Sequence, residues 1–172
     1  ILFAVISGML WFYSSSYKRM FLIGNLIVAF ISALVPLLVA MVNADHLRFL
    51  YHESLAYTPI VGQLYVWLGG FALFCMLLTL SREVVKDMED VEGDRELECR
   101  TMPIVWGEKV SKIVVTIVLL ATIALIAYLA WFVLPFPMEW ATFTGRFIIF
   151  GLMVPMLCVL ILYVGIVYTK GL

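Results

Sequence analysis

The chain carries little charge for its length, and this scarcity excludes an ordinary soluble domain. Only 13% of its 172 residues are charged, whereas 65% are hydrophobic and the mean hydropathy is +1.09. A soluble domain carries roughly 25% charged residues. The sequence also lacks the short alternation of polar and apolar residues that is typical of membrane β-barrel strands. We therefore expect an all-α membrane protein.

Paired cysteines are absent as well. Cys75, Cys99 and Cys158 form no C-x-x-C pair, so neither a disulfide framework nor a zinc site is indicated. His46 and His52 lie close to acidic residues, but an ordinary interfacial loop explains them better than a metal site. The cysteines and histidines therefore carry no functional prediction.

Five long hydrophobic stretches separate the charged residues. Each can hold roughly 20 apolar residues, the number that crosses a hydrocarbon core as a helix. The expected spans lie near residues 1–17, 20–42, 58–81, 113–134 and 147–169. The predicted fold class is a polytopic transmembrane helical bundle, with residues 1–172 forming a single membrane domain.

Basic residues are distributed unequally between the connections. Nine of the eleven Lys and Arg residues follow the first, third or fifth expected span, and only Arg48 and Arg146 lie elsewhere. Cytoplasmic connections carry such an excess. The segment of about 82–112 is therefore expected to face the cytoplasm. The protein is also expected to reside in a bacterial or archaeal cytoplasmic membrane, although the basic residues alone do not specify which membrane.

Acidic residues gather in this same segment, where eight fall within residues 83–98. Four of them follow one another at offsets of four, three and four, namely Glu83, Asp87, Asp90 and Asp94. If the third span continues as a helix, these offsets place the four carboxylates on one face. Gly93 is expected to end or loosen that helix.

Stacked carboxylates repel one another, and a divalent cation removes that repulsion. Mg²⁺ prefers oxygen ligands and is usually held by one or two carboxylates together with substrate phosphates. The spacing D-x-x-D-x-x-x-D therefore suggests a Mg²⁺–diphosphate site. Four nearby basic residues are candidates to neutralise phosphate oxygens: Arg82, Lys86, Arg95 and Arg100. The alternative is a solvated helix held by pairs such as Lys86–Asp90, and the spacing alone does not decide between them.

Two sequence motifs resemble motifs of the UbiA prenyltransferase superfamily, and they occur in the same order along the chain. The run REVVKDMEDVEGD, followed by RTMP, resembles its second aspartate-rich motif. Upstream, YSSSYKR and then GNLIVA resemble its Tyr/Lys motif and its G-N-x-x-V-A helix start, in which Asn25 is expected to cap or bridge helices. The aspartate-rich run is most similar to the geranylgeranylglycerol-phosphate geranylgeranyltransferase branch, although residues 96–99 stand where related sequences commonly have a glycine.

The resemblance implies nine transmembrane helices around a central cavity, of which about five are present here. The chain starts within a hydrophobic run, and we expect it to be a piece that lacks the first aspartate-rich motif and the final helix. The resemblance also implies that Asp87, Asp90 and Asp94 bind Mg²⁺ and, through it, the diphosphate of a polyprenyl donor. Tyr13 and Lys18 would approach the same diphosphate.

The implied activity is a Mg²⁺-dependent transfer of a polyprenyl group, expected to be geranylgeranyl, to a lipid-like glycerol phosphate. Metal and basic residues would stabilise the departing pyrophosphate, and the apolar cavity would shield the allylic cation from water. No covalent enzyme intermediate is needed, and the fragment alone is expected to be inactive. An aromatic quinone precursor is the alternative acceptor. Membrane lipids are expected partners, and nucleic acid is not.

Two other classes remain open. A cation transporter needs acidic residues within its spans, along the ion pathway, and none of the five expected spans has Asp or Glu in its middle. A membrane scaffold would show no dependence on the aspartate spacing, so Asp-to-Glu changes would be harmless in it.

Overall fold

The computed structural model describes residues 2–15, 20–51, 60–129 and 153–167. Within these ranges the chain forms helices joined by short connections, without a strand. The helices are α1 (Leu2–Ser15), α2 (Ile23–Leu50), α3 (Ile60–Glu89), α4 (Val91–Glu96), α5 (Met102–Trp106), α6 (Glu108–Tyr128) and α8 (Val154–Val167). The expected all-α bundle is confirmed.

Three of the described helices, α2, α3 and α6, are long and apolar enough to cross a membrane. They correspond to three of the five expected spans, so the chain is an integral membrane protein. The other two expected spans contain α1 and α8, whose described parts have 14 residues each, and both expected spans extend into residues outside the described ranges. In addition, α3 continues past the expected end of its span into the acidic segment.

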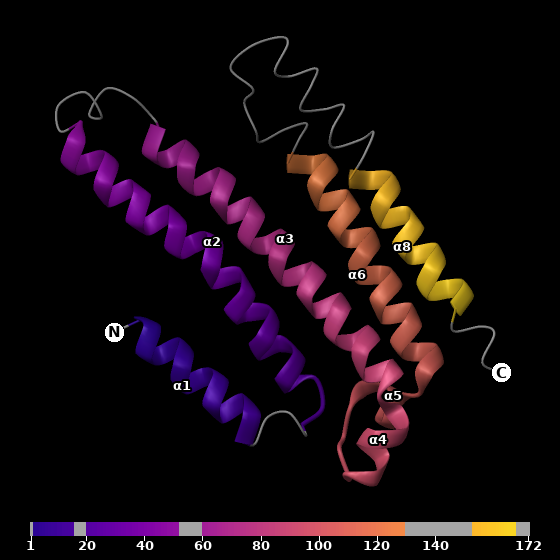
Figure 1. Cartoon of the computed structure of the whole chain (residues 1–172). Helices are drawn as coiled ribbons and strands as arrows, with labels where there is room; N and C mark the ends of the chain where they lie inside the picture. The colour runs from indigo at the N-terminus through magenta and orange to yellow at the C-terminus, as the bar shows by residue number, and fades with distance from the viewer. Residues whose placement is uncertain (1, 16–19, 52–59, 130–152, 168–172) are drawn as a thin grey trace.

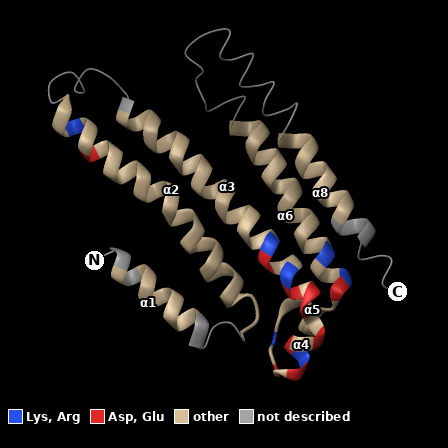
Figure 2. Ribbon diagram, viewed as in Figure 1, with Lys and Arg blue, Asp and Glu red and all other residues tan. Residues whose placement is uncertain are grey.

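The longer helices lie in a row that follows the order of the chain. Helix α1 packs on α2, α2 on α3, α3 on α6, and α6 on α8, as Figure 1 shows. The short helices α4 and α5 lie at one end of the row, against α3 and α6. Most of the Asp, Glu, Lys and Arg residues drawn in Figure 2 gather at this end, which we call the charged end.

Small residues let α2 approach α3 closely. The buried residues of α2 are Gly24, Asn25, Ala29, Ala33, Ala40 and Ala44. Small side chains allow the close backbone contacts that hold membrane helices together. Ser32 adds a polar contact, because its hydroxyl lies 3.0 Å from the Thr79 hydroxyl on α3. The start of α2 is therefore held firmly beside the end of α3.

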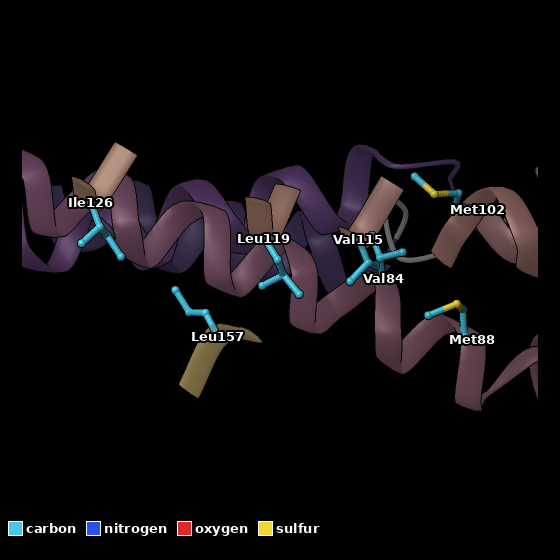
Figure 3. Close-up of a cluster of buried hydrophobic side chains, with 7 residues drawn as sticks. All are labelled: Val84, Met88, Met102, Val115, Leu119, Ile126 and Leu157. Atoms are coloured by element: carbon cyan, nitrogen blue, oxygen red, sulfur yellow. The ribbon is translucent and has the colours of Figure 1, made fainter. Parts of the chain in front are cut away.

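A cluster of buried apolar side chains holds the end of α3 from another side. Its members are Val84, Met88, Met102, Val115, Leu119, Ile126 and Leu157, and Figure 3 shows them along the contact between α3, α5, α6 and α8. The members on α6 recur at offsets of four and seven, so they form one face of that helix. The last turns of α3 are thus anchored by apolar packing beside the acidic residues.

Helix α3 ends at Glu89, and α4 begins at Val91. The expectation that Gly93 ends the helix is wrong, because Gly93 lies within α4. The break falls at Asp90, which occupies the N-cap position of α4 without a side-chain capping hydrogen bond, and acidic residues in the first turn of α4 suit its dipole. By comparison, a glycine inside a helix costs only about 1 kcal/mol.

Candidate functional site

A cavity of about 350 Å³ lies at the charged end, where α1, α2, α3 and α4 meet the turn before α5. Its wall contains five acidic residues: Glu83, Asp87, Glu89, Asp90 and Asp94. The polar wall is completed by Tyr13, Asn25, Lys86 and Thr101. Five carboxylates against one ammonium group make this wall strongly acidic.

The three aspartates expected to bind metal all reach this cavity. Asp87 comes from the last turns of α3, Asp90 from the break and Asp94 from α4. Backbone hydrogen bonds keep helical spacing through the break, from the Asp90 N–H to the Lys86 carbonyl and from the Asp94 N–H to the Asp90 carbonyl. Within the described ranges, however, no three His, Cys, Asp or Glu side chains converge closely enough to hold a metal ion unaided.

Only some of the residues expected to bind diphosphate lie in the cavity wall. Tyr13, near the end of α1, and Lys86, on α3, line the cavity. Lys18 lies outside the described residues. The structure thus brings one expected phenol and one expected ammonium group to the same wall as the aspartates.

The expected arginines do not line the cavity. Arg82 is 74% exposed, and its guanidinium lies 2.7 Å from a carboxylate oxygen of Glu83. Arg95 and Arg100 are exposed as well. The Arg82 ion pair partly balances a buried carboxylate, since the Glu83 side chain is only 8% exposed.

Asn25 bridges helices, as expected, and its partner is one of the candidate metal ligands. Its side-chain amide donates a hydrogen bond of 2.7 Å to an Asp87 carboxylate oxygen. Asn25 is 9% exposed and lies in the first turn of α2. The G-N helix start was the sequence signal for this residue, but no sequence pattern names Asp87 as its partner.

Sequence reasoning also missed Glu89 and Thr101 as wall residues. Glu89 lies two positions after Asp87 on α3, a spacing that places side chains on different faces of a helix. Both residues nevertheless line the same cavity. Thr101 is 6% exposed, and its hydroxyl oxygen is buried without a hydrogen-bond partner in the described part of the chain.

Asp87 lies in the part of α3 that extends beyond its apolar span. Burial is the main cause that raises the pKa of Asp87, from 3.8 to about 6. The Asn25 hydrogen bond opposes this shift, because it stabilises the charged form. Repulsion from Asp94 and Glu83 raises the pKa further, and attraction to Lys86 lowers it. The cavity therefore makes an isolated negative charge on Asp87 costly.

The class of protein follows from comparison with known families. The sequence model of the UbiA prenyltransferase family matches residues 1–170, so the chain belongs to this family. The resemblance drawn from its two motifs is confirmed.

Among its relatives, the digeranylgeranylglyceryl phosphate synthase of Pyrococcus furiosus is 34% identical over 117 residues, which cover 67% of this chain and 35% of that protein. The synthase of the same name from Methanopyrus kandleri is 34% identical over 118 residues, or 69% of this chain and 36% of that protein. The chain thus spans about a third of the length of the curated relatives it matches. No solved structure matches it.

Proposed function

We propose that this chain is part of an intramembrane prenyltransferase. The enzyme would move a geranylgeranyl group from its diphosphate to a lipid-like glycerol phosphate. The observation that carries the proposal is the acidic cavity, with Lys86 and Tyr13 in its wall, at the charged end of an apolar helical bundle. The names of the archaeal relatives support both the transferred group and the acceptor.

The donor set of the cavity fits Mg²⁺. Five carboxylates beside one lysine would repel a diphosphate, and a divalent cation between them removes that repulsion. Mg²⁺ is commonly held by one or two carboxylates plus phosphate oxygens, so the oxygens of a bound diphosphate would complete its coordination. We assign Asp87, Asp90 and Asp94 as the residues that hold it. When bound, Mg²⁺ neutralises charge that develops on the departing diphosphate.

The chain's own polar groups would position the donor. Lys86 and Tyr13 donate hydrogen bonds from the wall to phosphate oxygens, and Lys18 is proposed to do the same from the connection after α1. Three arginines are proposed to approach the diphosphate from the outer side: Arg82, Arg95 and Arg100. Charge-assisted contacts of this kind bind the diphosphate more strongly as its negative charge grows.

The proposed reaction breaks the bond between the prenyl C1 and the diphosphate oxygen, and the electron pair leaves with diphosphate. The acceptor hydroxyl oxygen then forms a bond with C1, and its proton passes to the released diphosphate. No side chain becomes covalently attached. The apolar helices next to the cavity exclude water, which would otherwise capture the reactive prenyl group.

The charged end is proposed to face the cytoplasm of an archaeal or bacterial cell. Most Lys and Arg residues of the chain lie at this end or in connections expected on the same side, and such residues are enriched on cytoplasmic sides. The prenyl diphosphate would therefore enter from the cytoplasm, while its chain lies among the apolar helices.

The experiment uses the full-length parent protein in membranes with geranylgeranyl diphosphate and Mg²⁺. Geranylgeranylglyceryl phosphate and an aromatic quinone precursor are supplied in separate reactions, and products are identified by mass spectrometry. A Mg²⁺-dependent product with the glycerol phosphate supports the proposal. Product formed only with the aromatic acceptor would show that the acceptor is a quinone precursor and not a glycerol phosphate. If folded protein forms no product, the proposed activity is overturned in favour of an ion site or a scaffold.

A further inference from the structure

The contact between Asn25 and Asp87 reaches from one helix to another, directly into the acidic cavity. The 2.7 Å hydrogen bond joins residues 62 positions apart, and both side chains line the cavity wall. Burying an amide without a partner costs about 1–3 kcal/mol. The hydrogen bond to Asp87 offsets this cost for the buried Asn25 amide. The acceptor, Asp87, is a candidate metal ligand.

An amide is chemically suited to hold a metal-binding carboxylate. Its N–H group fixes one oxygen of Asp87 and leaves the negative charge in place for a cation. A lysine at the same position would form an ion pair and compete with the metal. Residues that hydrogen-bond to metal ligands orient them, and their loss typically weakens metal affinity about 10- to 100-fold.

Packing holds Asn25 itself in position. Gly24 and Ala29, on either side of it, are both buried, and Ser32 binds Thr79 on α3 about two turns further along α2. These contacts fix the start of α2 relative to the end of α3. The Asn25 amide is therefore placed before any ligand arrives, so the orientation of Asp87 needs no reorganisation on binding.

We propose that Asn25 is a positioning residue, which holds the Asp87 carboxylate in the orientation that binds the metal of the diphosphate site. This inference rests on the proposed function for the identity of the site. It predicts a specific loss in Asn25→Leu, which has a similar volume but no donor: metal affinity falls about 10- to 100-fold, while the affinity for donor at saturating Mg²⁺ changes little.

The test measures Mn²⁺ binding to the full-length protein by electron paramagnetic resonance, with inorganic pyrophosphate present and no catalysis required. The Mg²⁺ concentration for half-maximal activity is measured separately. Asn25→Gln, which keeps an amide, is expected to bind Mn²⁺ more tightly than Asn25→Leu. If the leucine variant does not fold, Asn25→Ala, which also lacks the donor, takes its place, and a Mn²⁺ affinity equal to the wild type in that variant overturns the proposal.

The matched control is Ser32→Ala, which removes a polar contact from the same helix interface without touching the cavity. It is expected to lower Mn²⁺ affinity much less than Asn25→Leu, because the Asn25–Asp87 hydrogen bond itself remains. An equal loss in Ser32→Ala would show that only helix packing matters, and unchanged affinity in Asn25→Leu would show that the hydrogen bond does not position a ligand. Wild-type protein that binds Mn²⁺ with an affinity dependent on Asn25 but forms no prenylated product would overturn the proposed function alone.

Discussion

The Asn25 amide and the Asp87 carboxylate are joined by a 2.7 Å hydrogen bond that ties the start of α2 to the end of α3. This contact lies in the wall of the acidic cavity, where Asp90 and Asp94 also lie. This hydrogen bond therefore belongs both to the interface between α2 and α3 and to the candidate metal site. Changes at this point of the protein are expected to affect both helix packing and ligand binding.

Asp90→Asn is expected to lower Mg²⁺-dependent product formation by at least about 100-fold in the full-length protein, because a lost metal ligand also removes transition-state stabilisation. Product is measured by mass spectrometry in membranes. Asp45→Asn is the matched control, since Asp45 lies near the other end of α2 and its side chain is 80% exposed. Equal activity of the two variants would remove Asp90 from the site.

Lys86→Gln is expected to raise the KM for the prenyl diphosphate by roughly 10-fold, as a hydrogen bond between charged groups contributes about 1.5–3 kcal/mol. Arg95→Gln should have a smaller effect, because Arg95 is exposed and lies outside the cavity wall. Initial-rate kinetics at saturating Mg²⁺ compare the two. A larger effect at Arg95 would show that substrate binding rearranges α4.

Proton and metal are expected to compete at Asp87. Its pKa of about 6 lies above the ordinary 3.8, so the carboxyl is mostly protonated at pH 5 and mostly ionised at pH 7.5. Mg²⁺ must displace this proton, and its apparent affinity should fall by up to about tenfold per pH unit below pH 6. Titration of Mg²⁺ at several pH values measures the slope, which Asp87→Asn should flatten.

The raised pKa of Asp87 also makes the free energy of unfolding depend on pH in the absence of metal. A raised pKa means that folding favours the protonated carboxyl, so the contribution of Asp87 is fully present below pH 3.8 and is lost as pH rises through about 6. Thermal unfolding at pH 5 and 7.5 should show this loss, and Asp87→Asn should reduce it. A pH dependence that is the same in Asp87→Asn would assign it to other groups.

Leu119→Ala is expected to lower the free energy of unfolding by roughly 2–3 kcal/mol, because it leaves a cavity in the cluster between α3, α6 and α8. The neighbouring Leu120→Ala is the control. Leu119 is fully buried, whereas Leu120 is 53% exposed, so its truncation removes mainly contacts with lipid. Unfolding in mixed detergent micelles compares the two, and similar losses would contradict the packing of α6.

The fold class could be predicted from the sequence because membrane insertion is governed by local hydropathy. The apolar stretches that form α2, α3 and α6 are evident without knowledge of their neighbours. The aspartate spacing was informative for a similar reason, since offsets of three and four place side chains on one helix face. Asp87, Asp90 and Asp94 do line one cavity, and the motifs around them identify the family.

The end of α3 could not be predicted in the same way. Asp90 is a residue type found at the start of a new helix and Gly93 is disfavoured within a helix, and these two preferences differ by only about one weak propensity. The packing of Val84 and Met88 fixes α3 as far as Glu89. Beyond this end, Asp90 and Asp94 still line the cavity, whereas Arg95 lies outside its wall.

The sequence by itself determined an apolar helical bundle with one acidic, basic-flanked end, because these properties depend on residues close together in the chain. Only the tertiary structure decided which side chains share the cavity. The pairing of Asn25 with Asp87 depends on how closely the small residues of α2 let it approach α3. That distance is set by packing between segments 62 residues apart, and no local pattern encodes it.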